Sequence, residues 1–144
     1  MNSYGLIDLH CDTLAEYWKY AHTGNPDTLD DPGRVLSLSN MPKDVHWAQF
    51  YAVFIPDEER GQAAIDYFEK NRANFYRQME KFGDRVAPCR NADDMEKAWA
   101  AGKTAAFLTI ENGSALAGDL SRVHTLAEQG VRAITLTWNG ENEL

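Results

Sequence analysis

The sequence has 144 residues, of which 22 are acidic and 14 basic, and a formal net charge of -8. A chain of this length can bury a core, and we expect one domain over residues 1–144. The acidic excess argues against a nucleic-acid or anionic-membrane surface. No apolar stretch reaches the roughly 18 residues of a membrane span, and the N-terminus lacks a basic signal region, so we expect a cytoplasmic protein.

The first predicted element is a strand within GLIDLHCDT, residues 5–13. Side chains alternate between the two faces of a strand, so Asp8, His10 and Asp12 are expected to share one face. The other face is expected to carry Ile7, Leu9 and Cys11. Buried carboxylates are costly unless a cation receives them, and imidazole beside carboxylate is a ligand set of first-row metals. The strand therefore predicts a metal-binding face.

Neither cysteine is expected to form a disulfide. Cys11 and Cys89 do not make a disulfide framework, and the sequence shows no secretion signal. On a regular strand Cys11 points away from His10 and Asp12. We expect a small buried residue there rather than a soft metal ligand.

Strands and helices alternate along the rest of the chain. A short helix is predicted at 14–24, and a polar loop from Asn25 to Asp44 follows it. The next predicted elements are a strand at 45–55, a long helix from Asp57 to Phe82, a helix at 91–102, a strand at 104–113, a helix at 119–130 and a strand at 131–140. The long helix has acidic residues in its first turn and an apolar stripe formed by Ile65, Phe68, Phe75, Met79 and Phe82.

This pattern predicts an α/β fold of four parallel strands joined by right-handed helical crossovers, because the strands are too uniformly apolar for a sheet with one wet face. Working groups of such folds gather at the carboxyl ends of the strands. The first strand ends at His10 and Asp12, the third at Glu111 and the fourth at Trp138. We therefore expect one imidazole and two carboxylates to converge at the carboxyl ends of adjacent strands.

A simpler interpretation exists for each motif taken singly. A lone H-x-D occurs often by chance, and a Glu at a strand end can cap a helix or meet a lysine. Their joint position at strand ends favours a metal site formed by His10, Asp12 and Glu111. The other three histidines are expected to be ordinary surface or partly buried residues: His22, His46 and His124.

Four segments together resemble the N-terminal part of the membrane dipeptidase (renal dipeptidase) family. They are LIDLHCDT, WAQFYAVFIP, GKTAAFLTIENG and GVRAITLTWNGENEL, in the order and with the separations expected of that family. The resemblance covers nearly the whole chain but only the first portion of a family member. It implies about the first half of a (β/α)8 barrel of the metal-dependent hydrolase type.

The resemblance further implies a two-zinc enzyme that hydrolyses dipeptides, including those with a C-terminal D-residue. His10 and Asp12 match the ligands of one zinc, and Glu111 matches the carboxylate that bridges both. The metal-activated water would attack, so no protein nucleophile is required and no further catalytic residue is assigned. Trp138 stands where many family members have a histidine that contacts the substrate, so it is a candidate substrate-binding residue with an altered role.

The family's remaining zinc ligands lie on strands beyond the fourth. We therefore expect this 144-residue chain to bind zinc weakly or not at all, to lack dipeptidase activity alone, and to self-associate or to need a missing C-terminal half. Two other functions stay open. One is a metal-dependent phosphoesterase of the polymerase and histidinol phosphatase type, although Asp12 replaces the second histidine of its D-x-H-x-H motif. The other is a non-catalytic flavodoxin-like binding module, although residues 10–17 lack phosphate-binding glycines.

Overall fold

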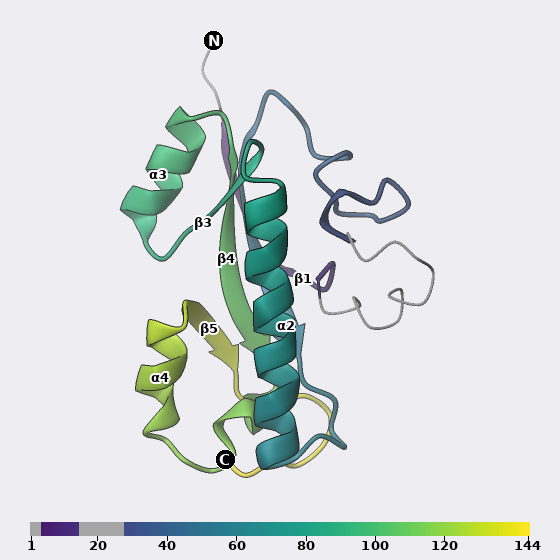
Figure 1. Cartoon of the computed structure of the whole chain (residues 1–144), viewed down its shortest axis with the longest axis vertical. Helices are drawn as coiled ribbons and strands as arrows, with labels where there is room; N and C mark the ends of the chain where they lie inside the picture. The colour runs from purple at the N-terminus through teal and green to yellow at the C-terminus, as the bar shows by residue number, and fades with distance from the viewer. Residues whose placement is uncertain (1–3, 15–27) are drawn as a thin grey trace.

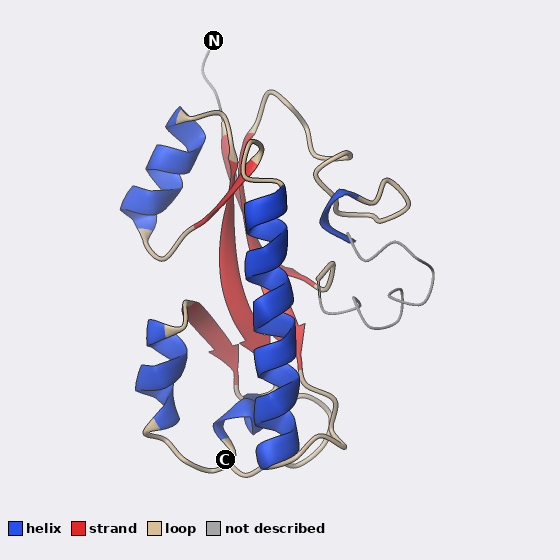
Figure 2. Ribbon diagram, viewed as in Figure 1, coloured by secondary structure: helices blue, strands red, loops and turns tan. Residues whose placement is uncertain are grey.

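The computed structural model describes residues 4–14 and 28–144 (Figures 1 and 2). The helix predicted at 14–24 falls almost entirely outside these residues. The elements are β1 (Gly5–Cys11), η2 (Thr28–Asp30), β2 (His46–Phe54), α2 (Gln62–Lys81), β3 (Val86–Pro88), α3 (Ala92–Ala100), β4 (Thr104–Glu111), η3 (Gly113–Leu116), α4 (Arg122–Glu128) and β5 (Val131–Thr135). Among the described residues, no helix has the length and apolar character needed to cross a membrane.

All strand pairs of the sheet are parallel, which confirms the predicted fold class. β1 pairs with β2, β2 with β4, and β4 with β5, so each long strand lies beside the next long strand of the chain. The sheet has one strand, β3, that was not expected from the sequence. It pairs with the amino-terminal part of β4, Thr104–Ala106, whereas β5 pairs with the carboxyl-terminal part, Leu108–Glu111. With only three residues, β3 is too short for a periodic pattern to reveal it.

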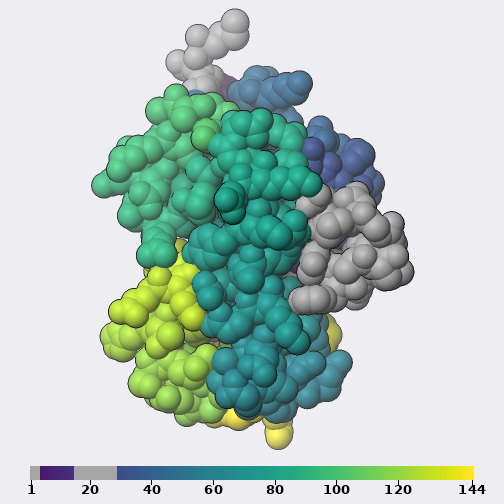
Figure 3. Space-filling view, in the orientation of Figure 1, coloured from purple at the N-terminus to yellow at the C-terminus, as the bar shows by residue number. Residues whose placement is uncertain are grey.

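Helix α2 runs along one face of the sheet and forms the main core with it (Figures 1 and 3). Phe68, Phe75 and Met79 of the predicted stripe are buried there against β2 and β4, while Ile65 and Phe82 are only partly buried. Helix α3 packs near the amino ends of β2 and β4 in a second, smaller core. The amino end of α2 lies near the carboxyl ends of the strands, where it packs against η3, the short helix after β4.

Helix α2 begins five residues later than predicted. Its first residue is Gln62, preceded by Gly61 with φ of +52°. The acidic residues expected in its first turn, 57–59, instead belong to the loop after β2, where the Glu59 amide donates to the Pro56 carbonyl. By contrast, α3 begins at Ala92, close to the start of the helix predicted at 91–102, and the Asn91 side chain caps it by accepting a hydrogen bond from the Asp94 amide.

The polar loop before β2 is fastened to the sheet by one ion pair. Arg85, just before β3, donates to both carboxylate oxygens of Asp30 at 2.9 and 2.7 Å. The Arg85 guanidinium lowers the pKa of Asp30 below its ordinary 3.8, and Ser39 assists by a hydrogen bond of 2.7 Å. The pair therefore stabilises the fold where Asp30 is ionised.

Asp30→Asn is expected to lower the free energy of unfolding by about 0.5 to 1 kcal/mol at pH 7, a small value because water screens the pair. The native carboxyl has the lower pKa, so this difference holds above pH 3.8 and disappears as the pH falls through the native pKa. Urea unfolding from pH 3 to 7 measures it, with Glu80→Gln on α2 as control. An equal loss at pH 3 and pH 7 would contradict the ion-pair explanation.

Candidate metal centre

Strand β1 carries His10 and Asp12 to the edge of the sheet, but it is not a regular strand. Asp8 is in register with Gln49 and Cys11 with Tyr51, so three residue steps of β1 oppose two of β2. This bulge contains His10, whose amide donates to the Asp8 carboxylate at 3.1 Å.

The bulge corrects one prediction. Because register partners project to the same face, Asp8 shares the face of Cys11 rather than that of His10 and Asp12. Cys11 is 6% exposed and belongs to the main core, as expected for a small buried residue. Burial raises the pKa of its thiol to about 11, which keeps it protonated in the metal-free protein.

Strand β4 delivers Glu111 to the same edge. Its residues 105–110 are buried, and Glu111 is the last residue of the strand, in register with Phe54 of β2. We expected His10 and Glu111 to come from adjacent strands, which is wrong, because β2 lies between β1 and β4. The two side chains meet nevertheless across the end of β2.

The ligand atoms of His10, Asp12 and Glu111 all lie within 4.8 Å of one another. His10 Nε2 is 3.4 Å from Asp12 Oδ2 and 3.6 Å from Glu111 Oε2. Two ligands that bind one ion at 2.0–2.2 Å in tetrahedral geometry are about 3.4 Å apart. The cluster therefore has the spacing and the donor types of a divalent-metal site with three protein ligands.

The electrostatics of the cluster also suit a cation. Burial raises the pKa of Glu111; His10 opposes this effect, and the negative charge of Asp12 adds to it. Asp12 and His10 have about half of their side-chain surface exposed, so an ion and a small substrate can reach them. A divalent ion would offset the cost of holding two carboxylates together.

Trp138 lies in the loop after β5, on the side of the sheet that carries Glu111. Its ring packs edge-on against Phe54, the register partner of Glu111, with 4.8 Å between ring centroids. The side chain is 48% exposed. Residues 137–142 and Leu144 surround an open hollow of about 580 Å³ beside it. The indole is thus available to contact a ligand.

The other histidines that the structure describes lie elsewhere. His46 begins β2, at the opposite end of the sheet, and stacks on Trp99 with 5.5 Å between ring centroids. His124 is exposed on α4. His22 lies outside the described residues.

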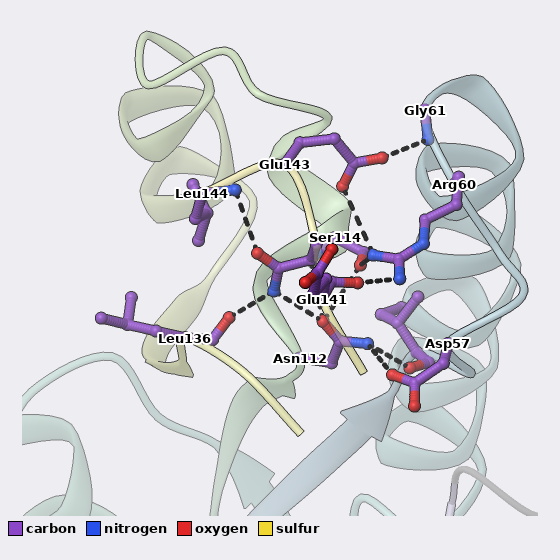
Figure 4. Close-up of polar contacts among 11 residues, drawn as sticks. Asp57, Arg60, Gly61, Asn112, Ser114, Leu136, Glu141, Glu143 and Leu144 are labelled. Carbon is purple, nitrogen blue, oxygen red and sulfur yellow. Dashed lines mark hydrogen bonds and ion pairs between the residues drawn. The ribbon is translucent and has the colours of Figure 1, made fainter. Parts of the chain in front are cut away.

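A polar network beneath the cluster was not predicted from the sequence. It is centred on Asn112, the residue after Glu111, and joins the loops that follow β2, β4 and β5 (Figure 4). The dipeptide Asn112-Gly113 after a strand signals a turn. The partners of the Asn112 side chain, at Ile55, Asp57 and Asn142, are 30 to 57 residues away in the chain.

Comparison with known proteins identifies the family. The profile of the membrane dipeptidase family, peptidase family M19, matches residues 1–144. The chain belongs to the membrane dipeptidase family. This match favours the dipeptidase family over the two alternatives that the sequence left open, the phosphoesterase and the flavodoxin-like module. The search of curated proteins found no match.

Solved structures of M19 dipeptidases share the fold of this chain. One is the dipeptidase AC, a metallopeptidase, with a TM-score of 0.80 and 19% identity over 98% of this chain and 45% of that one. A metallopeptidase from Rhodobacter sphaeroides, bound to a phosphinate mimic of the dipeptide L-Ala-D-Ala, gives 0.80 and 17% over 98% of this chain and 47% of that one. The probable dipeptidase PvdM from Pseudomonas aeruginosa gives 0.75 and 20% over 94% and 35%. This chain thus spans less than half the length of these relatives.

Proposed function

We propose that this chain provides half of a zinc dipeptidase site, with His10, Asp12 and Glu111 as its metal ligands. The observation that carries the proposal is the convergence of these three side chains at the carboxyl ends of parallel strands in a member of a metallopeptidase family. Carboxyl strand ends are where barrel enzymes place their working residues. The substrate class follows the R. sphaeroides relative, which binds a dipeptide mimic.

Each ligand has a defined role in this proposal. A bound zinc ion supplies a water of lowered pKa and polarises the carbonyl of the scissile peptide bond. His10 near the end of β1 and Asp12 just after it would hold an ion, and the two oxygens of Glu111 would allow it to contact one ion or two. Glu111 is the least exposed of the three, so it fixes the inner side of the site.

Three ligands shared between two ions leave each ion short of the three that a catalytic zinc takes. We therefore propose that residues 1–144 form about half of a barrel domain and that turnover needs ligands from outside this chain.

Hydrolysis of L-Ala-D-Ala tests the proposed function. It is measured with zinc present, in the product of the complete reading frame that encodes residues 1–144 and in the 144-residue chain alone. We expect turnover by the former, its loss in His10→Ala, and none by the latter. Hydrolysis that persists in His10→Ala, or turnover by the short chain with two tightly held ions, would contradict the assigned roles.

Trp138→His is expected to change the dipeptide kinetics of that complete product far more than its stability. The ring is half exposed and touches Phe54 by one edge, so its removal costs little buried apolar area. An imidazole can accept as well as donate hydrogen bonds, whereas an indole only donates. kcat and KM for L-Ala-D-Ala are measured beside the thermal midpoint. Unchanged kinetics would place Trp138 outside the substrate pocket.

A further inference from the structure

Asn112 is held in a backbone conformation that few residues adopt. Its φ is +76° and its ψ is +109°, and its side chain is fully buried directly after Glu111. Outside glycine, positive φ is uncommon and persists only where the surroundings impose it. The contacts of the Asn112 amide show what imposes it here.

The side-chain amide nitrogen of Asn112 forms hydrogen bonds to the loop after β2. Nδ2 donates to the Ile55 carbonyl at 2.9 Å and to Asp57 Oδ1 at 3.2 Å (Figure 4). The Ile55 amide in turn donates to the carbonyl of Glu111 at 2.9 Å. Hydrogen bonds of the Glu111 carbonyl and of the Asn112 side chain thus join the end of β4 to the loop after β2.

The side-chain amide oxygen of Asn112 accepts hydrogen bonds from the loops after β4 and β5. Oδ1 accepts from the Ser114 hydroxyl at 3.0 Å, from the Ser114 amide at 3.3 Å and from Asn142 Nδ2 at 3.0 Å. One buried amide therefore bridges the ends of three strands, with both its donor and its acceptor in use.

Further hydrogen bonds hold the loop after β5 near Asn112. Asn142 Nδ2 also donates to the Leu136 carbonyl at 2.6 Å, and the Gly113 amide donates to the same carbonyl at 3.0 Å. Any Cβ on Gly113 would come within 2.9 Å of that oxygen, so the close approach requires glycine. Arg60 adds bonds to the Ser114 hydroxyl and the Glu141 carbonyl (Figure 4). Trp138 sits in the middle of this loop.

We propose that Asn112 is a positioning residue that fixes the Trp138 loop relative to Glu111. It would couple the metal ligand and the candidate substrate contact, which stand on different strands. The metal-related part of this inference rests on the proposed function. Removal of a residue that orients a metal ligand typically lowers metal affinity by 10- to 100-fold.

Asn112→Gly separates the amide from the backbone conformation, because glycine adopts φ of +76° without strain. Ala117→Gly is a matched control: Ala117 also has positive φ, +51°, but its side chain can make no hydrogen bond. Zinc affinity is measured by calorimetry in the product of the complete reading frame that encodes residues 1–144. Acrylamide quenching of the Trp138 fluorescence is measured for each protein. The contribution of Trp138 is the difference in fluorescence between that protein and the same protein with Trp138→Phe.

Asn112→Gly is expected to weaken zinc binding by about 10-fold and to raise the quenching of Trp138 by roughly twofold, as a half-exposed ring becomes free. Ala117→Gly should change neither. If Asn112→Gly does not fold, Asn142→Ala should still raise the quenching: it keeps Asn112 and removes the bonds of the Asn142 side chain to Asn112, Leu136 and Leu144. Wild-type quenching in a folded Asn112→Gly or Asn142→Ala would overturn the inference. No zinc binding by wild type, with quenching still raised in the variants, would overturn the proposed function and leave the positioning of the loop in place.

Discussion

Glutamine in place of Glu111 is expected to weaken zinc binding by at least about 100-fold, more than the loss of a residue that only orients a ligand. The substitution keeps the size of the side chain but removes the negative charge that a divalent ion needs at this position. Glu111 is also the ligand with the least exposed side chain, 20% against 51% for Asp12, so water replaces it poorly. Calorimetric titration with zinc of the product of the complete reading frame measures the change.

The matched control for this prediction is Glu96→Gln, an exposed carboxylate on α3 near the opposite end of the sheet. Unfolding must be excluded as the cause. Burial raises the pKa of Glu111, so its charged form is unfavourable without a cation, and glutamine should not lower the thermal midpoint of the metal-free protein at pH 7. Equal zinc affinity in wild type and Glu111→Gln would remove Glu111 from the ligand set.

Self-association of the 144-residue chain is the second large effect that we expect. Within the described residues, β1 pairs only with β2 and β5 only with β4, so both edges of the sheet have unpaired backbone groups. Apolar side chains are exposed along β1, with Ile7 52% and Leu9 68% exposed, and Leu136 after β5 is 64% exposed. Such edges pair with other chains unless they are covered.

Leu9→Lys is expected to shift the chain toward monomer, because charged residues on edge strands oppose pairing. Leu120→Lys is its control, since Leu120 is 69% exposed but lies before α4, outside the strands. Sedimentation velocity over a tenfold range of concentration measures the distribution. A wild-type chain that stays monomeric throughout, or an equal effect of both lysines, would contradict edge-to-edge association.

The sequence predicts the parallel sheet and the main helices because these depend on local patterns. The continuous apolar run at 105–110 and the stripe of Phe68, Phe75 and Met79 each determine which face is buried. The start of α2 was wrong because residues 57–61 have longer-range partners: Arg60 contacts Ser114 and Glu141, and the Gly61 amide donates to Glu143 at 3.3 Å. These contacts hold the segment as a loop despite its acidic helix-start pattern.

The candidate site could be predicted only in part. His10, Asp12 and Glu111 were proposed as ligands because each stands at the end of a predicted strand, a local signal. Alternation along β1 placed Asp8 with them, since a bulge leaves no trace in a pattern of period two. The hydrogen bonds of the Asn112 side chain could not be predicted from the sequence, because they depend on how three loops pack against one another.

Anomalous X-ray diffraction at the zinc absorption edge, from crystals of the 144-residue chain soaked in excess zinc, tests the metal site most directly. Excess zinc compensates for weak binding by an incomplete ligand set. We predict an anomalous peak about 2.0–2.2 Å from His10 Nε2 and from carboxylate oxygens of Asp12 and Glu111. A map with zinc peaks elsewhere and none among these three side chains would contradict the account.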